Sequence, residues 1–360
     1  MIRILQCVNN MHRAGLETML MNYYRNIDRT QIQFDFLTHR PERSDYDDEI
    51  EALGGRIYRA PRLYPQNYPA YFAYMRRFFR EHPEYRIIHS HIDAMSYLPL
   101  LAAKKAGLPV RIAHSHSTSI DKDFKYPLKL YFRSKLSQAA NVRLACGEEA
   151  GHFLFGEEPF TVISNAIDPE PFYFDPEVRQ RKRDALGINA ELVIGHVGRF
   201  SYPKNHRFLV EVFQEVNRRQ QNAVLLLTGT GEKEQEIRDQ VQMLNLEEKV
   251  LFLGSRDDVS ELYQAMDVFV MPSLFEGVPL VGIEAQAAGL PCIFSDRVPK
   301  EVQIAGNCEF LPLEKAAPVW AERILAVNSE GRADAEEMLR NSRYNIKHTS
   351  NILENFYLSM

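Results

Sequence analysis

Two carboxylates with a short, defined separation stand out in the stretch between residues 269 and 296. Glu276 and Glu284 have seven residues between them, with Glu276 in a predicted loop and Glu284 in a predicted short helix. That helix is expected to open near Pro279 and close at Gly289, because proline is favoured at helix starts and glycine past helix ends. A helix N-terminus offers backbone N–H groups and a partial positive charge to a phosphate. The pattern predicts a site for a phosphate and a polyhydroxylated group, with the phosphate-binding segment Gly277, Val278, Pro279, Leu280 and Val281.

The same residues also allow a purely structural interpretation. Ser273-x-x-Glu276 matches a capping box, in which a serine and a glutamate satisfy the first amides of a helix. In that interpretation Glu284 is an exposed helix residue without a ligand.

A basic pair follows the predicted strand Leu192–Gly198. Arg199 comes directly after this strand, and Lys204 follows five residues later. The planar fork of arginine and the mobile charge of lysine both suit a diphosphate. Ligands collect at the carboxyl ends of parallel strands, so this position favours a binding role over a solvated basic loop, which is the alternative.

These two motifs resemble the signatures of glycosyltransferase family 4, whose members are retaining enzymes with the GT-B fold. The carboxylates match E-x7-E within Phe-Glu-Gly-x-Pro-Leu, and the basic pair matches G-R-x-x-x-x-K. The resemblance implies that Glu276 lies against the donor sugar and that Glu284 binds the nucleotide ribose. It also implies that Arg199 and Lys204 clasp the diphosphate of the donor. In such a site the protein supplies the positive charge, so no metal and no cofactor are expected.

The first half of the chain carries looser matches to the same family. Gly15 follows the first predicted strand, where the family commonly has two glycines close to the donor phosphate, and Ala14 replaces one of them. Gly15 is therefore the predicted binding residue of this turn. The segment from Asn165 to Asp168 resembles the family signature at the crossover between domains, which implies a structural role for Asn165.

Four histidines occur as two alternating pairs, His89-Ser-His91 and His114-Ser-His116. Alternation in a strand places both members of a pair on one face. We interpret His89 as a core residue. The resemblance implies that the histidine ending the second strand contacts the donor sugar, with His116 preferred and His114 as the alternative. The catalytic set that the resemblance implies is completed by three residues named above, Glu276, Arg199 and Lys204.

Metal binding by the histidines is a further possibility, but no acidic or cysteine partner with ligand spacing lies near them. Asp121-Lys-Asp123 spells D-x-D, the metal motif of the other glycosyltransferase fold. Three letters recur by chance, so the sequence predicts no metal site.

Short β-branched runs alternate with amphipathic segments along the chain, and this alternation restarts near Leu192. We expect an α/β protein with two Rossmann-like, doubly wound parallel-sheet domains that face an inter-domain cleft, as in GT-B enzymes. Residues 1–168 form the predicted acceptor-side domain and residues 169–345 the predicted nucleotide-sugar domain. Residues 346–360 form a helix that crosses back to the first domain. Three prolines between Asn165 and Asp184 predict a linker there.

Composition narrows the functional class. The 360 residues are 45% hydrophobic and carry a net charge of −5, which gives no sign of bulk nucleic-acid binding. Four scattered cysteines, no membrane-length apolar run and no signal peptide predict a reduced, cytoplasmic protein. Basic and aromatic residues alternate between Lys122 and Lys135, which suits either peripheral association with the inner membrane surface or an ordinary solvated helix.

The resemblance therefore implies a retaining glycosyltransferase of the bacterial exopolysaccharide or capsule type. It would move a sugar from a nucleotide diphosphate donor, expected to be a UDP-sugar, to a lipid-linked or saccharide acceptor. Two alternatives remain open. One is an isomerase of the UDP-N-acetylglucosamine 2-epimerase type, which shares the fold, and the other is a non-catalytic scaffold for polysaccharide assembly.

Overall fold

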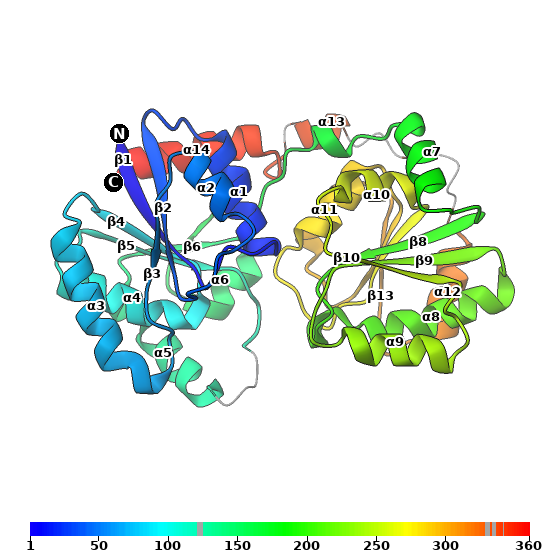
Figure 1. Cartoon of the computed structure of the whole chain (residues 1–360), viewed down its shortest axis with the longest axis horizontal. Helices are drawn as coiled ribbons and strands as arrows, with labels where there is room; N and C mark the ends of the chain where they lie inside the picture. The colour runs from blue at the N-terminus through cyan, green and yellow to red at the C-terminus, as the bar shows by residue number, and fades with distance from the viewer. Residues whose placement is uncertain (121–124, 328–331, 333–335, 341) are drawn as a thin grey trace. The chain divides into compact units, whose positions relative to one another are not determined.

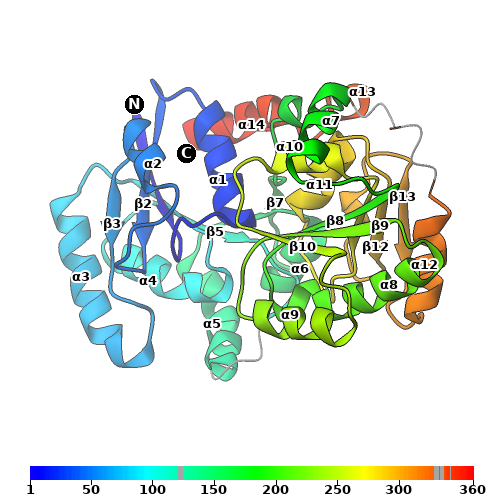
Figure 2. The same ribbon diagram turned by 45° about the vertical axis from the view of Figure 1, so that its right-hand side comes forward.

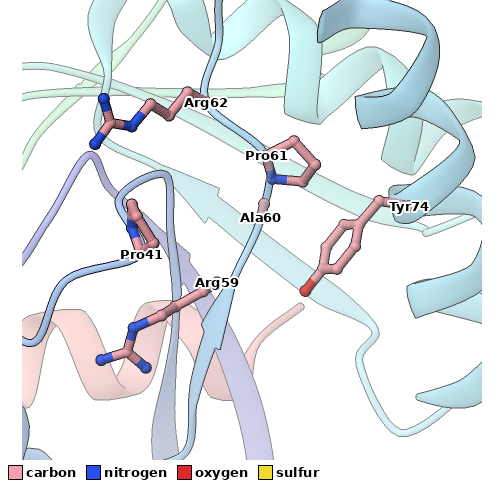
Figure 3. A pocket seen from close by; sticks show the side chains of 6 residues that line it. All are labelled: Pro41, Arg59, Ala60, Pro61, Arg62 and Tyr74. Atoms are coloured by element: carbon pink, nitrogen blue, oxygen red, sulfur yellow. The ribbon is translucent and has the colours of Figure 1, made fainter.

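The structure is a computed structural model that describes residues 1–120, 125–327, 332, 336–340 and 342–360. The chain divides into two compact units, shown from two directions in Figures 1 and 2. Unit 1 comprises Met1–Ala166 together with Ile346–Met360, and unit 2 comprises Ile167–Asn345. Each unit contains one fully parallel sheet with helices on both faces. This architecture confirms the predicted pair of Rossmann-like parallel sheets.

Unit 1 contains a seven-stranded sheet in the order β3-β2-β1-β4-β5-β6-β7. The order runs outward from β1 in both directions, which is the doubly wound pattern. The strands are β1 (Ile2–Cys7), β2 (Ile32–Thr38), β3 (Ile57–Arg59), β4 (Ile87–Ser90), β5 (Val110–Ser115), β6 (Val142–Ala145) and β7 (Thr161–Val162). The central strands read as nearly continuous apolar runs because both faces of the sheet are covered.

The two faces of this sheet are covered by different helices. Helices α3 (Tyr68–Glu81), α4 (Tyr97–Lys105) and α5 (Tyr126–Ala139) pack on one face around a core that includes Leu5 and Ile88. Figure 1 shows α1 (Gly15–Asn26) and α14 (Ile346–Leu358) together on the other face. The shorter helices of the unit are α2 (Asp47–Ala52) and α6 (Glu148–Phe155).

The last helix of the chain belongs to unit 1. The ring of Tyr357 in α14 packs edge-on against Phe34 of β2, with 6.0 Å between the centroids. Glu354 accepts a hydrogen bond from the backbone amide of Asp28. A segment that ends the sequence is therefore part of the core built on the first strands.

Unit 2 contains a six-stranded parallel sheet in the order β10-β9-β8-β11-β12-β13. The strands are β8 (Leu192–Val197), β9 (Ala223–Thr228), β10 (Val250–Gly254), β11 (Val268–Met271), β12 (Cys292–Ser295) and β13 (Cys308–Leu311). Helices α8 (His206–Arg219), α9 (Glu234–Met243) and α12 (Ala317–Leu325) build the core on one face. The remaining helices are α7 (Pro176–Ala185), α10 (Val259–Ala265), α11 (Leu280–Ala287) and α13 (Glu336–Arg340).

Two differences from the sequence expectations have clear physical causes. The edge strands β3 and β13 were not predicted, because they are three and four residues long and mostly only half-buried. The predicted linker contains helix α7, whose first residue is Pro176. The side chain of Asp175 caps this helix by accepting hydrogen bonds from the next free amides, so the proline starts the helix and does not interrupt it.

No helix within the described parts of the chain combines the length and the apolar character that crossing a bilayer requires.

Candidate active site

Lys204 and Glu276 form an ion pair at the carboxyl ends of two adjacent strands of unit 2. Lys204 ends the turn that follows β8, and Glu276 lies in the loop that follows β11. Lys204 Nζ lies 2.6 Å from Glu276 Oε1. The two side chains are only 18% and 12% exposed, so the pair is shielded from water and held more tightly than a surface pair.

Backbone hydrogen bonds hold these two loops against each other. The amide of Leu274 donates to the carbonyl of Pro203 over 2.7 Å. Asn205 adopts a left-handed conformation with φ of 55° and donates from its side chain to the carbonyl of Pro272. Asparagine tolerates this conformation better than most residues do. The position of Lys204 beside Glu276 is therefore fixed by the loop backbones as well as by the ion pair.

Arg199 lies apart from this ion pair. Its side chain is 70% exposed and pairs with Glu232, with 3.0 Å between the charged atoms. Glu232 itself follows the glycine-rich turn after β9. An exposed guanidinium with an exposed partner can change partners at little cost in free energy.

Glu284 is buried in the first turns of α11, which begins at Leu280. The hydroxyl of Tyr263 donates to its carboxylate over 3.0 Å. Burial raises the pKa of Glu284 to about 7, and the hydrogen bond from Tyr263 acts in the opposite direction. The carboxyl group therefore titrates close to neutral pH.

The capping-box interpretation is wrong. Pro279 is extended, with ψ of 118°, and α11 starts only after it, so Ser273 and Glu276 precede the helix by several residues. In the described part of the chain the buried hydroxyl of Ser273 has no hydrogen-bond partner. The expectation that Pro279 is the first helical residue was off by one position, since it occupies the N-cap. The segment Gly277, Val278, Pro279, Leu280 and Val281 runs from the loop into the first turn of this helix.

The two glycines after β9 allow this turn to pack closely against the loop that follows β8. A Cβ atom on Gly229 would lie 2.2 Å from the carbonyl oxygen of Gly198, and one on Gly231 would lie 2.4 Å from that of Phe200. Gly229 also has φ of +132°. This turn therefore supports the loop that carries Arg199.

Two buried histidines next to Lys204 were missed in the sequence. His196 in β8 is bonded through Nδ1 to the carbonyl of Val270 over 2.8 Å. The ring of His206 stacks on Phe200, with 4.2 Å between the centroids. Burial lowers the pKa of His196 to about 4 and that of His206 to about 2, so both rings are neutral. The one available signal was a histidine inside an otherwise apolar strand.

A Cβ atom on Gly198 would lie 3.0 Å from His196 Nε2 and 3.3 Å from Lys204 Cδ. The neutral imidazole therefore lies beside the stem of the lysine, with Gly198 filling the narrow space between them. This nitrogen has no hydrogen-bond partner among the residues that the structure describes.

Unit 1 brings the four histidines of the two H-S-H motifs together at the ends of β4 and β5. His89 Nε2 lies 3.0 Å from His114 Nδ1, and His91 Nδ1 lies 2.9 Å from His116 Nε2. The amide of His116 also donates to the carboxylate of Asp93. The interpretation of His89 as a core residue agrees with its burial, but the ring also takes part in a polar cluster.

Burial keeps these imidazoles neutral. It lowers the pKa of His116 to about 3 and holds the pKa values of His89, His91 and His114 well below the usual range. Ring nitrogens of the last three lie within 4.8 Å of one another, a grouping that could hold a metal ion. The sequence suggested metal binding by these histidines only as an alternative, because it could not show that His114 of one motif meets His89 and His91 of the other.

The other predicted positions of unit 1 are less informative. Gly15 is exposed and starts α1, and a Cβ atom there would meet nothing within 4 Å. Asp121, Lys122, Asp123 and Phe124 lie outside the described residues, so the D-x-D motif has no structural account.

Models of known protein families match both halves of the chain. Residues 13–171 match the model of Glycosyltransferase Family 4, and residues 191–329 match that of Glycosyl transferases group 1. The putative glycosyltransferase EpsF of Bacillus subtilis is 39% identical over 368 residues, covering 99% of this chain and 96% of EpsF. An Escherichia coli UDP-Gal:alpha-D-GlcNAc-diphosphoundecaprenol alpha-1,3-galactosyltransferase is 30% identical over 225 residues, covering 59% of this chain and 58% of that enzyme.

Solved structures match the fold over the full length. The crystal structure of HepE from Anabaena in complex with UDP-glucose has a TM-score of 0.84 at 18% identity, with 100% of both chains covered. At that identity the likeness concerns the fold alone. With the parallel sheets of both units, the matched family models and the full-length similarity to EpsF, the chain belongs to glycosyltransferase family 4 and has the Rossmann-like units of the GT-B fold.

Proposed function

We propose that this protein transfers a sugar from a UDP-sugar to a lipid-linked or saccharide acceptor, with retention of configuration, during synthesis of a cell-surface polysaccharide. The observation that carries the proposal is the shielded Lys204–Glu276 ion pair at the strand ends of unit 2. A UDP-sugar donor and a lipid-linked acceptor are supported by the E. coli relative, whose name gives UDP-Gal and GlcNAc-diphosphoundecaprenol. The UDP donor is further supported by HepE, which was solved with UDP-glucose.

Lys204 is the proposed group that stabilises the leaving diphosphate. Negative charge grows on the diphosphate as the bond to the sugar breaks, and a cation held in place stabilises that charge without reorganisation. Glu276 holds the ammonium group in position and is proposed to lie against the donor sugar. Arg199, with its exposed fork, is proposed to leave Glu232 and bind the diphosphate from the other loop.

Glu284 is the proposed ribose ligand. A carboxylate can accept hydrogen bonds from both ribose hydroxyls, and its burial beside Tyr263 keeps it fixed. The phosphate is proposed to lie near the segment from Gly277 to Val281, where α11 begins, and Gly15 is a further proposed donor-binding residue. In unit 1, His116 is the proposed sugar contact and His114 the alternative.

The acceptor is proposed to be presented at the inner membrane surface. Helix α5 exposes Leu130 and Tyr131 and also carries Lys129 and Lys135. Apolar and basic side chains on one helix suit a bilayer with anionic lipids. The proposed domain roles are acceptor binding for unit 1 and nucleotide-sugar binding for unit 2.

One experiment separates this proposal from its two alternatives. The purified protein is incubated with several nucleotide sugars, with and without membrane lipid or saccharide acceptors, and both the release of nucleoside diphosphate and any change in the sugar of the donor are measured. A transferase releases the diphosphate only with an acceptor, an epimerase changes the sugar of UDP-N-acetylglucosamine without an acceptor, and a scaffold turns over nothing. NMR of the glycosidic bond in the product then tests retention, since a product with inverted configuration contradicts it.

A further inference from the structure

A continuous row of six hydrogen-bonded side chains runs through unit 1, and we call it the histidine row. It crosses three neighbouring strands of the sheet, β1, β4 and β5, and includes one residue of the last helix. In order, its members are His116, His91, Gln6, Tyr357, His89 and His114.

Gln6 connects the two halves of this row. Its Oε1 lies 2.8 Å from His91 Nε2, and its Nε2 donates to the hydroxyl of Tyr357 over 3.2 Å. The same hydroxyl lies 2.6 Å from His89 Nδ1. Gln6 and Tyr357 are both fully or almost fully buried, so water does not compete for these bonds.

The row has two ends, and both are ring nitrogens without a partner. By hydrogen-bond geometry neither His116 Nδ1 nor His114 Nε2 has a partner within the described residues, although both atoms are buried; the backbone of Ala145 acts on the His114 ring and opposes the effect of burial on its pKa. The two rings lie side by side, with 4.1 Å between their centroids. Because these two unpaired nitrogens belong to adjacent rings, they are candidate contacts for one ligand group.

For a given orientation of the Gln6 amide, the hydrogen positions along the row follow from counting donors and acceptors. Burial keeps all four histidines neutral, so each ring carries one N–H and one lone pair. Oε1 of Gln6 can only accept, so His91 must donate to it from Nε2. His91 Nδ1 then accepts from His116 Nε2, which leaves His116 Nδ1 as a lone pair.

The other half follows in the same way. Tyr357 accepts from the Gln6 amide, and among the described residues His89 Nδ1 is the only remaining acceptor for its hydroxyl hydrogen, so the hydroxyl donates there. His89 then donates from Nε2 to His114 Nδ1, which leaves an N–H at His114 Nε2. All four rings thus carry hydrogen on Nε2, and one end of the row accepts while the other donates. Turning the Gln6 amide over moves all four hydrogens to Nδ1 and exchanges the two ends, but it still gives one donor and one acceptor.

We propose that Gln6 and Tyr357 are positioning residues that make His114 and His116 a matched donor and acceptor for a hydroxyl-bearing substrate. A hydroxyl group donates one hydrogen bond and accepts others, so it satisfies both ends together. A phosphate oxygen only accepts, and a metal ion requires lone pairs, so each of them satisfies one end and leaves the other unmatched. The identification of the ligand as a sugar hydroxyl rests on the proposed function, whereas the state of the rings does not.

The test is a long-range 1H–15N correlation spectrum of protein labelled at the histidine rings. In the wild type we expect all four rings of the row to carry hydrogen on the same nitrogen, Nε2. Rings that differ from one another overturn the proposal, whereas a joint change of all four rings to Nδ1 corresponds to the turned Gln6 amide and keeps one donor and one acceptor. This measurement needs no substrate and no variant.

Two matched variants test whether Tyr357 sets the hydrogen positions of the histidine rings. Tyr357→Phe removes only the hydroxyl, so His89 and His114 are expected to lose their single form while His91 and His116 keep theirs. Tyr23→Phe is the control, because Tyr23 is a buried tyrosine of the same unit whose hydroxyl donates to the Ser164 carbonyl outside the row. The proposal fails if Tyr357→Phe leaves all four rings unchanged, or if Tyr23→Phe disturbs them equally.

Spectra recorded with added ligands distinguish this proposal from the proposed function. UDP-glucose is expected to shift the ring nitrogens of His114 and His116, while UDP, which lacks the sugar, does not. If the wild-type rings share one form but UDP-glucose shifts none of them, the positioning by Gln6 and Tyr357 stands and the sugar contact of the proposed function is wrong. Zinc chloride serves as the third probe, since displacement of the row hydrogens by zinc at micromolar concentration would mark a metal site and overturn the hydroxyl assignment.

Discussion

The hydroxyl of Tyr263 lies 3.0 Å from Oε2 of Glu284, in a part of unit 2 where both side chains are buried. The tyrosine also lies 3.1 Å from the carbonyl of Val281, so its one hydrogen is shared between two acceptors. A carboxylate with so few donors is poorly solvated, and this explains why its pKa reaches about 7. A ligand that brings two further donors changes this balance.

Binding of UDP-glucose should therefore strengthen as pH rises from 6 to 8. Ribose hydroxyls donate to the ionised carboxylate, so binding lowers the pKa of Glu284 and releases a proton. Calorimetry in buffers with different ionisation enthalpies measures both the affinity and the proton release. UDP-glucose suits this experiment because, unlike UDP, it has no phosphate that titrates near pH 6.

Glu284→Gln is the control for this pH dependence. The amide cannot titrate, so its affinity for UDP-glucose should be lower at pH 8, by about 1.5–3 kcal/mol, and nearly independent of pH. An unchanged affinity in Glu284→Gln would remove Glu284 from the nucleotide site. A wild-type affinity that falls with rising pH would contradict the proposed ionisation.

Gly229→Ala should destabilise unit 2 strongly. The added Cβ would lie 2.2 Å from the Gly198 carbonyl oxygen, and the positive φ is strained for alanine. We expect the free energy of unfolding to fall by about 3 kcal/mol or more, as for other overpacked or strained sites. Urea denaturation followed by circular dichroism measures it.

Gly254→Ala is the matched control for the glycine experiment. Gly254 also has a positive φ, of +67°, but a Cβ there would meet nothing within 4 Å. Its loss should amount to only about 1 kcal/mol, the usual cost of this conformation for a residue with a side chain. Equal losses in the two variants would mean that the approach of the β9 turn to Gly198 contributes little.

Much of the fold follows from local sequence patterns. Four short apolar runs of the sequence coincide with strands, namely Ile87–Ser90, Val250–Gly254, Val268–Met271 and Cys292–Ser295, because buried parallel strands consist of short apolar runs between turns. Elements with weak local signals were missed. Strand β3 has only three residues, and helix α7 was hidden by Pro176, which breaks a helix in its interior but favours its start.

The candidate site also combines features that the sequence predicts with features that it does not. The positions of Lys204 and Glu276 after strands could be predicted, since strand ends are visible in the sequence. Their ion pair could not, because it depends on how two loops cross. The histidine row was even harder to predict from the sequence. Gln6 and Tyr357 are separated by 351 positions and meet only through the packing of α14 on the first sheet. Spacing rules cannot find such a contact.

Turnover is expected to survive EDTA. In the proposed mechanism Lys204 and Arg199 supply the positive charge at the diphosphate, so removing divalent ions should change the initial rate by less than about twofold. Initial rates are measured with UDP-glucose and an acceptor after dialysis against EDTA. Loss of activity that magnesium or manganese restores would contradict the metal-free mechanism. Restoration by zinc alone would instead point to the histidines of unit 1.

Lys204→Ala should lower kcat on the order of a hundredfold or more and raise the donor KM much less. The ammonium group stabilises charge that develops only as the diphosphate leaves, so its loss affects the transition state more than the bound donor. Steady-state kinetics with a range of donor concentrations measures both constants. Lys204→Ala also leaves Glu276 without the lysine, so the double variant Lys204→Ala/Glu276→Gln serves as the control that removes the carboxylate charge as well. If that double variant recovered most of the rate, the defect of Lys204→Ala would come from the carboxylate and not from the missing cation.

Variants of Arg199 provide a second test of the proposed charge stabilisation at the diphosphate. Its side chain is 70% exposed and bonded to Glu232, so Arg199→Lys should leave the stability of unit 2 unchanged. Activity should nevertheless remain low, because a point charge cannot replace the two parallel hydrogen bonds of the guanidinium fork to a diphosphate. Comparing kcat of Arg199→Lys with that of Arg199→Ala decides this. Similar low values support a bidentate contact, a lysine variant with wild-type kcat shows that any cation suffices, and wild-type values in both variants mean that Arg199 belongs to a solvated loop outside the site.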